Sequence, residues 1–211
     1  MNLRIVEIFK SIQGESSFAG FPFLFIRLAG CNLRCSYCDT KYAQEENNFP
    51  EIEIEKILNK IESYKIRRVL VTGGEPLLQN NVYNLIEQIL NMKKEVFIET
   101  NGSILLDKVD YSVVKIVDFK TPSSGMCQKN NFKNIHYLTE NDEVKFVIGC
   151  EEDFKWSIDV VKKYKLEQQV RNIHFSPVWN KLNAKILGEW ILSTNVDVRL
   201  TIQLHKILNM K

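Results

Sequence analysis

The stretch at residues 31–38 reads Cys31-Asn32-Leu33-Arg34-Cys35-Ser36-Tyr37-Cys38, with three cysteines separated by three and then two residues. Three thiolates at this spacing can bind three irons of a [4Fe–4S] cube and leave the fourth iron without a protein ligand. An iron with an open coordination position can bind a further molecule, whereas a fully ligated cluster usually only passes electrons. The spacing therefore predicts a catalytic iron–sulfur cluster.

A structural zinc site is the main alternative for these cysteines. Zinc in such sites has four tetrahedral ligands, commonly two Cys-x2–4-Cys arms or a cysteine pair with a histidine pair. Cys35 and Cys38 could form one arm, but the sequence has no second arm, because Cys127, Cys150 and His136 are each isolated. A disulfide framework is disfavoured, since five cysteines are an odd number and we expect no secretory signal.

The composition is that of an ordinary globular protein, with 45% hydrophobic and 26% charged residues. We expect residues 1–211 to form one domain with a substantial core, with the cluster loop at residues 30–40. No apolar run approaches the about 18 residues that a membrane span needs, and we expect a cytoplasmic protein. The formal net charge is +2 and the basic residues are scattered, which disfavours nucleic acid as a partner and favours a small molecule.

Strand-like and helix-like segments alternate along the chain after the cysteine loop. Apolar residues at helical spacing predict helices near residues 54–61, 82–89, 154–161 and 182–191. Runs rich in Val, Ile and Phe predict strands near residues 3–9, 23–29, 68–71, 95–99, 113–119, 143–148, 171–175 and 196–204. About six βα units are too few for a complete eight-fold barrel of about 250 residues. We therefore predict an α/β fold, an open partial (β/α)6-type barrel of mostly parallel strands with flanking helices.

A second motif ends the strand-like run near residues 68–71. In Thr72-Gly73-Gly74-Glu75-Pro76, the glycines let the backbone approach a ligand closely, and Pro76 suits the start of a helix. The motif alone is also typical of a plain turn. Together with the three cysteines, it resembles the segment of radical S-adenosylmethionine (SAM) enzymes that holds the methionine amino group. The resemblance implies that the open iron binds SAM and that one electron cleaves SAM to a 5′-deoxyadenosyl radical.

Polar residues end three further strand-like runs, at residues 99–102, 118–120 and 176–179. Each segment by itself is more often a capped turn than a ligand contact. Their shared position at strand ends favours a common cofactor pocket.

The N-terminal segment narrows the family. Ser11-Ile12-Gln13-Gly14-Glu15 precedes the strand that leads into the cysteines, Asp39-Thr40 follows the third cysteine, and Gln203-Leu204-His205-Lys206 lies near the end. The order of these segments resembles the 7-carboxy-7-deazaguanine synthase family over almost the full chain. This resemblance implies a radical SAM lyase with a [4Fe–4S] cluster, SAM and Mg²⁺. It would contract 6-carboxy-5,6,7,8-tetrahydropterin to 7-carboxy-7-deazaguanine with loss of ammonia, in queuosine and deazapurine biosynthesis.

The resemblance also implies roles for individual residues. Cys31, Cys35 and Cys38 would bind the cluster, Thr40 would give its hydroxyl to Mg²⁺, and Arg27 would pair with the substrate carboxylate. The other pterin contacts would be Ile12, Gln13, Gly14, Glu15, Thr72 and His205. The SAM contacts would be Tyr37, Cys38, Asp39, Gly74, Glu75, Asp118, Phe119, Lys120, Ser176, Pro177, Val178 and Trp179.

Several of these residues have a purely structural alternative. Arg27 could be a surface charge, Asp39 could cap a helix, and a lone histidine such as His205 is more often structural than a ligand contact. The tail also departs from the family pattern His-Lys-x-x-Trp with a terminal Pro, since residues 205–211 contain neither Trp nor Pro. Closure of the pocket by the C-terminus is therefore not predicted.

A glycyl-radical-enzyme activating protein is the second functional candidate. It would share the chain length, the cysteine spacing and the Gly-Gly-Glu-Pro turn, but would act on a protein backbone. Residues 11–15, Arg27 and Thr40 favour a small carboxylated substrate with Mg²⁺ instead. The family resemblance further implies a homodimer and a flavodoxin or ferredoxin as electron donor.

Overall fold

A nine-stranded sheet organises the computed structural model, which describes residues 1–210. The strand order is β3-β1-β2-β4-β5-β6-β7-β8-β9. The strands β3, β1 and β2 pair antiparallel, and every pair from β2–β4 to β8–β9 is parallel. The strands are β1 (Asn2–Ile12), β2 (Pro22–Leu28), β3 (Glu51–Glu53), β4 (Arg68–Gly73), β5 (Glu95–Thr100), β6 (Val114–Phe119), β7 (Glu143–Ile148), β8 (Asn172–Pro177) and β9 (Arg199–Leu200).

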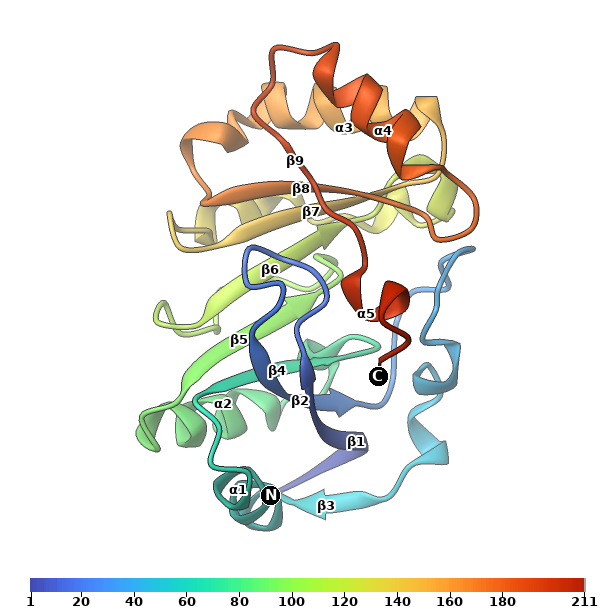
Figure 1. The fold of residues 1–211 in the computed structure, drawn as a ribbon. Coiled ribbons are helices and arrows are strands. Elements are labelled where there is room, and N and C mark those ends of the chain that lie inside the picture. The colour runs from blue at the N-terminus through green and yellow to red at the C-terminus, as the bar shows by residue number, and fades with distance from the viewer. Residues whose placement is uncertain (211) are drawn as a thin grey trace.

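Helices flank the outer side of this curled sheet, as Figure 1 shows. The α-helices are α1 (Ile54–Ser63), α2 (Val82–Asn91), α3 (Glu151–Tyr164), α4 (Ala184–Leu192) and the single turn α5 (Leu204–Ile207). The helix α1 buries Ile54, Ile57 and Ile61, which lie on one face at the spacing that the sequence shows. The expected open, mostly parallel α/β architecture is confirmed, and α5 alone lies on the inner side, next to the β1–β2 hairpin (Figure 1).

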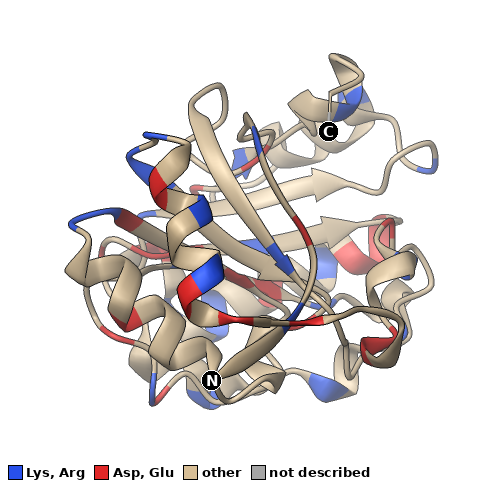
Figure 2. Cartoon of the chain, turned by 90° about the horizontal axis from the view of Figure 1, so that it is seen from below, with Lys and Arg blue, Asp and Glu red and all other residues tan. Residues whose placement is uncertain are grey.

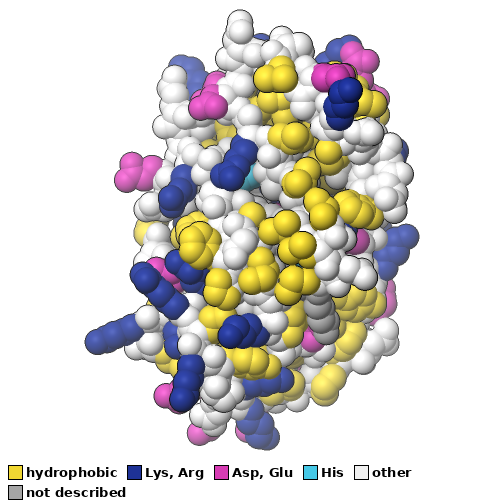
Figure 3. Space-filling view, viewed as in Figure 1, with side chains coloured by type: hydrophobic (Ala, Val, Ile, Leu, Met, Phe, Trp, Pro, Cys, Tyr) yellow, Lys and Arg dark blue, Asp and Glu magenta, His cyan; other side chains and the backbone are white. Residues whose placement is uncertain are grey.

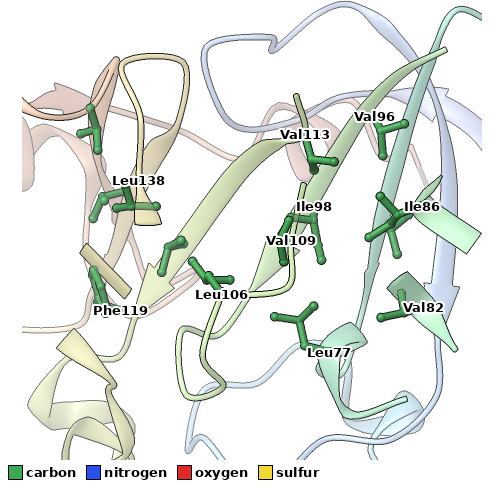
Figure 4. Packing of buried hydrophobic residues seen from close by; sticks show 14 of the residues in the cluster. Leu77, Val82, Ile86, Val96, Ile98, Leu106, Val109, Val113, Phe119 and Leu138 are labelled. Carbon is green, nitrogen blue, oxygen red and sulfur yellow. The ribbon is translucent and has the colours of Figure 1, made fainter. Parts of the chain in front are cut away.

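The two sides of the strands β2, β4 and β5 contribute to different hydrophobic clusters. Side chains alternate along a strand, so Val96 and Ile98 face the helices in the main core, part of which Figure 4 shows. Between them, Phe97 faces inward and packs with Phe23 and Leu70 in a second, smaller cluster. The ring centroids of Phe97 and Phe23 are 4.8 Å apart and the planes nearly perpendicular, at 68°. This aromatic floor fills the inside of the partial barrel and leaves room above it only toward the carboxyl ends of the strands.

The predicted strand at residues 196–204 is wrong in most of its length. Only β9 pairs with the sheet, through His174 opposite Arg199 and Phe175 opposite Leu200. The amide of Thr201 still donates to the carbonyl of Phe175 (2.9 Å), after which the chain leaves the sheet edge and enters α5. The short strand β3, which pairs with the start of β1, was not predicted, because one isoleucine between two glutamates is too short a pattern to indicate a strand.

The surface carries both signs of charge and, on the face shown in Figure 3, a hydrophobic band. Lys and Arg alternate with Asp and Glu along the outer helices in Figure 2, with no massed basic face. On the face of Figure 3, hydrophobic side chains gather along the middle. No helix within residues 1–210 is long and apolar enough to cross a membrane.

Candidate functional site

One cavity of about 630 Å³ lies at the carboxyl ends of the parallel strands. Its wall includes Arg27 of β2, Thr72 of β4, Asp118 of β6 and Lys145 of β7, and the segment around α5 covers it. Parallel strands bring residues that follow different strands to the same edge of a sheet, which is where α/β proteins bind their ligands. Of the residues predicted for the site, all but Glu75, Phe119 and Ser176 line this cavity.

The cysteine loop forms one side of the cavity, and Cys31, Cys35 and Cys38 all line it as free thiols. Cys127 and Cys150 are not part of the cavity wall, so neither supplies a fourth thiolate ligand there. Among the described residues, no three His, Cys, Asp or Glu side chains converge on a single metal ion, which disfavours the zinc alternative. Each cysteine of a cubane cluster binds a different iron, so three thiols spread around one cavity wall fit such a cluster.

Burial governs the chemistry of these thiols. It raises the pKa of Cys35 to about 11 and also raises the pKa of Cys31, so burial by itself favours neutral thiols. Iron binds thiolates, and metal binding therefore has to release these protons. The loop itself is fixed by backbone bonds, including Cys31 N to the Gln44 carbonyl (3.1 Å) and Ser36 N to the Ser124 carbonyl (3.0 Å).

The Gly73-Gly74 turn presses against the base of the cysteine loop. Gly73 has φ of +149°, and a Cβ there would lie 2.2 Å from the Leu28 carbonyl oxygen. A Cβ on Gly74 would lie 2.3 Å from the Gly30 carbonyl oxygen and 2.7 Å from Cys31 Cβ. Both positions therefore require glycine, and Gly74 brings bare backbone to the cavity beside a cluster cysteine.

Three predicted SAM contacts turn away from the cavity. The carboxylate of Glu75 is fully buried and accepts hydrogen bonds from Thr100 Oγ1 (2.9 Å) and from the backbone N–H of Asn101 (2.7 Å) and Leu77 (3.1 Å). It therefore ties the turn after β4 to the end of β5, where Thr100 and Asn101 do line the cavity. Phe119 points into the hydrophobic core, and Ser176 is buried on the strand.

Charged residues from four elements meet at the inner wall. Asp118 Oδ2 bonds Lys120 Nζ at 2.9 Å and lies 3.4 Å from Lys145 Nζ. Lys145 Nζ also bonds Glu15 Oε2 at 2.7 Å and Glu99 Oε1 at 2.6 Å. We call Glu15, Glu99, Asp118, Lys120 and Lys145 the charged network. Asp118 Oδ1 is buried and has no hydrogen-bond partner within residues 1–210, so the network leaves one acceptor for a ligand.

The C-terminal segment closes over the residues predicted to bind the pterin. Gln203 Nε2 donates to Glu15 Oε1 (2.6 Å), and the backbone N–H of Leu204 donates to the Gly14 carbonyl (2.9 Å). A Cβ on Gly14 would lie only 2.0 Å from His205 Nδ1, so glycine lets the histidine ring lie directly on this backbone. Closure by the C-terminal segment, which the departing tail sequence did not predict, is therefore present within the described chain, although the Trp and Pro of the family pattern are absent.

Arg27 and Thr40 lie at the outer part of the cavity. Arg27 Nε bonds Glu7 Oε1 at 2.9 Å, which orients the guanidinium, and its terminal nitrogens make no hydrogen bond within residues 1–210. Thr40 Oγ1 donates to Asp39 Oδ1 (2.9 Å), whose other oxygen bonds Lys206 Nζ at 2.7 Å. Hydroxyl and carboxylate oxygens are ligands that Mg²⁺ prefers, so this pair fits the expected metal.

Sequence reasoning missed Lys145 and Glu7 as parts of the site. Lys145 stands in the middle of Glu143-Val144-Lys145-Phe146-Val147-Ile148. A parallel strand is covered on both faces, so a lysine inside such a run is a signal of a buried partner. Glu7 lies in a strand whose alternation marks its face but does not identify Arg27 as its partner.

Comparisons with known proteins agree with this geometry. Residues 25–116 match the family model described as the Radical SAM superfamily. The chain is similar to 7-carboxy-7-deazaguanine synthase of Chlorobaculum tepidum, with 40% identity over 98% of this chain and 94% of that protein. It is also similar to the enzyme of the same name from Koribacter versatilis, at 36% identity over 98% of this chain and 96% of that protein. Among solved structures, QueE from Escherichia coli shares the fold with a TM-score of 0.79 and 24% identity, covering 97% of this chain and 95% of that one.

Proposed function

Because the chain belongs to the 7-carboxy-7-deazaguanine synthase family of radical SAM enzymes, we propose that it converts 6-carboxy-5,6,7,8-tetrahydropterin to 7-carboxy-7-deazaguanine and ammonia. The observation that carries the proposal is one cavity that brings together three cluster-type cysteines, Gly74, Arg27 and Glu15. The product differs from the substrate by ammonia, so the overall reaction needs no external oxidant.

Residues of the cavity wall would hold the cluster and SAM. Cys31, Cys35 and Cys38 hold the cluster, and bound SAM supplies the 5′-deoxyadenosyl radical that starts the reaction. Asp118 and Lys120 line the cavity with opposite charges, which would suit the amino and carboxylate groups of the methionine part. The remaining SAM contacts in the cavity wall are Tyr37, Asp39, Gly74, Pro177, Val178 and Trp179.

The pterin would bind between Arg27 and Glu15. The terminal guanidinium nitrogens of Arg27 suit the substrate carboxylate in a bidentate pair, because Nε is already held by Glu7. Glu15, as a carboxylate, accepts the paired N–H donors of the aminopyrimidinone edge. Thr40 contributes a hydroxyl to Mg²⁺, with substrate and water as further ligands. The other substrate contacts in the wall are Ile12, Gln13, Gly14, Thr72 and His205.

We infer further that the protein works in the cytoplasm as a homodimer, receives electrons from a flavodoxin or ferredoxin, and serves queuosine or related deazapurine biosynthesis. Exposed hydrophobic side chains along the C-terminal segment support self-association. These are Leu200, Ile202, Ile207, Leu208 and Met210.

An anaerobic turnover assay tests the function. The reconstituted, reduced protein is incubated with SAM and the carboxytetrahydropterin, with and without Mg²⁺, and products are identified by mass spectrometry. We expect 7-carboxy-7-deazaguanine, about four irons per chain, and loss of iron in Cys35→Ala but not in the control Cys127→Ser. A colourless protein with one zinc, or a glycyl radical formed on a partner enzyme without any deazaguanine product, would overturn the proposal.

A further inference from the structure

Lys145 is the centre of the charged network and has no role in the functions assigned above. Its side chain is 8% exposed, and its ammonium contacts three carboxylates that come from three different elements. The distances are 2.7 Å to Glu15, 2.6 Å to Glu99 and 3.4 Å to Asp118. The ammonium donates hydrogen bonds to Glu15 and Glu99, and Asp118 adds a third ion pair.

The balance of charge shows what Lys145 does for its neighbours. The network holds three carboxylates (Glu15, Glu99 and Asp118) against two ammonium groups (Lys120 and Lys145). Lys120 bonds Asp118, so Lys145 is the cation in contact with Glu15 and Glu99. Without Lys145, two mostly buried carboxylates would face each other with no cation bonded to them, and at least one would take up a proton.

The ionisation of Glu15 matters most for function, because Glu15 is the carboxylate predicted to contact the pterin. Burial would raise its pKa, but the charge and hydrogen bond of Lys145, with smaller effects from Gln203 and His205, lower it to about 2. Gln203 Nε2 fixes the other carboxylate oxygen at 2.6 Å, so both oxygens are oriented by side chains from opposite sides. Each oxygen keeps a lone pair for a ligand in the cavity.

We propose that Lys145 is a positioning residue that holds Glu15 ionised and oriented as the acceptor for the aminopyrimidinone edge of the substrate. The proposal deepens the function proposed above and rests on it for the identity of the substrate. The groups that face Glu15 are Lys145 of β7, Glu99 of β5, Asp118 of β6, and Gln203 and His205 of the C-terminal segment.

A measurement without substrate tests the first half. Protein labelled with ¹³C at the glutamate carboxyls is titrated by NMR, and the Glu15 signal is assigned by its loss in Glu15→Gln. In the wild type, we expect no titration of Glu15 between pH 5 and 8. In Lys145→Met, we expect its signal to titrate within that range, and in Lys145→Arg to remain that of a carboxylate. Titration of Glu15 in the wild type, or its continued ionisation in Lys145→Met, would overturn the proposal whether or not the protein binds a pterin.

A binding measurement tests the second half. The dissociation constant of the carboxytetrahydropterin is measured calorimetrically for the anaerobic holoenzyme with SAM and Mg²⁺ from pH 5 to 8. The ratio of the Lys145→Met constant to the wild-type constant removes the substrate's own titration. This ratio should rise as pH falls below the pKa that Glu15 has in Lys145→Met, by up to about tenfold per pH unit. The reason is that Glu15 of the variant must lose one proton before the substrate binds.

Two comparisons separate the possible failures. Lys115→Met removes another fully buried lysine, which pairs with Asp142 (3.0 Å) away from the cavity, and should leave the ratio independent of pH. If the wild type binds the pterin and the Lys145→Met ratio is also flat, Lys145 is only structural and the inference fails. If the wild type does not bind the pterin, the proposed function fails, while the NMR titration still decides the state of Glu15.

Discussion

At the scale of single residues, Asn101 lies outside the cysteine loop but contacts the sulfur of a cluster cysteine, Cys31. Its Oδ1 accepts hydrogen bonds from the N–H (3.0 Å) and hydroxyl (2.6 Å) of Ser103. These bonds fix the amide orientation, so Nδ2 must face Asn32 Oδ1 (3.1 Å) and Cys31 Sγ (3.8 Å). Its backbone N–H is held by Glu75 as well. An N–H donor is therefore held near the sulfur of a cluster ligand.

We predict that Asn101→Leu shifts the reduction potential of the reconstituted cluster to more negative values. Hydrogen bonds to cluster sulfurs stabilise the reduced cluster, which carries one more negative charge, and thereby raise the potential. Leucine has no N–H donor in its side chain, so this stabilisation is lost. The potential is measured by a redox titration monitored by electron paramagnetic resonance. Ser103→Ala, which frees only the far end of the amide, should give a smaller shift in the same direction. An unchanged or more positive potential in Asn101→Leu would contradict the prediction.

The residue scale also shows how far sequence reasoning reaches. Cys31, Cys35 and Cys38 could be identified because their spacing is itself the chemical requirement. Glu75 could not be assigned correctly, since its partners Thr100 and Asn101 follow a different strand and only the fold shows that its carboxylate turns inward. The same holds for Lys145, whose three partners are far away along the chain.

At the scale of elements, the turn after β4 and the cysteine loop act as one unit. The N–H of Glu75 donates to the Gly30 carbonyl (2.8 Å), and Gly74 lies against Cys31 with no space for a side chain. The turn therefore sets the position of Cys31, the first cluster ligand. A change in the turn should displace Cys31 and weaken binding of the cluster.

We predict that Gly74→Ala reduces iron loading far more than it reduces stability. The new methyl group would lie 2.3 Å from the Gly30 carbonyl oxygen and 2.7 Å from Cys31 Cβ, so the cysteine loop has to move. Iron per chain after anaerobic reconstitution and the midpoint of urea unfolding measure the two effects.

Gly188→Ala is the matched control: the nearest atom to its Cβ is 3.5 Å away, and it lies inside α4. There we expect full iron loading and a gain of about 0.5–1 kcal/mol in unfolding free energy. Normal iron content in Gly74→Ala would contradict the coupling of turn and loop.

Elements with a strong local pattern were predictable, and the C-terminal segment was not. The helices α1 and α2 bury side chains at regular helical spacing, so the pattern alone located them to within a few residues. Residues 196–204 alternate like a strand, but the long-range bonds of Gln203 to Glu15 and of Leu204 to Gly14 draw the chain off the sheet edge. A local pattern cannot indicate contacts with residues that are nearly the whole chain away.

At the scale of the whole molecule, buried carboxyl groups give opposite responses to pH. Burial would raise the pKa of Glu15, but Lys145 lowers it to about 2, and His174 helps to lower the pKa of Glu143 despite its burial. The stability that these two carboxylates contribute is present above their ordinary pKa of 4.5 and is lost as pH falls below it, for Glu15 down to about 2. Burial raises the pKa of Glu75 to about 7, although three groups donate to it. The folded state then keeps a proton that the unfolded chain releases near 4.5, so stability falls as pH rises from about 4.5 to about 7. The cluster-free protein should be most stable in mildly acidic solution.

We therefore predict that Glu75→Gln becomes more stable relative to the wild type as pH rises from 5 to 8. Glutamine stays neutral, whereas the wild type has to ionise a buried carboxyl, and each unit of pKa shift corresponds to about 1.4 kcal/mol. The gain in relative unfolding free energy should be roughly 1–3 kcal/mol over this range.

Urea unfolding of both cluster-free proteins at each pH measures this gain, and taking the difference removes the contributions of Glu15, Glu143 and the histidines. The glutamine amide faces the N–H groups of Leu77 and Asn101, which adds a constant cost at every pH, so only the trend with pH is decisive. A difference that does not change between pH 5 and 8 would mean that the hydrogen bonds to Glu75 fully offset its burial and that it is ionised throughout.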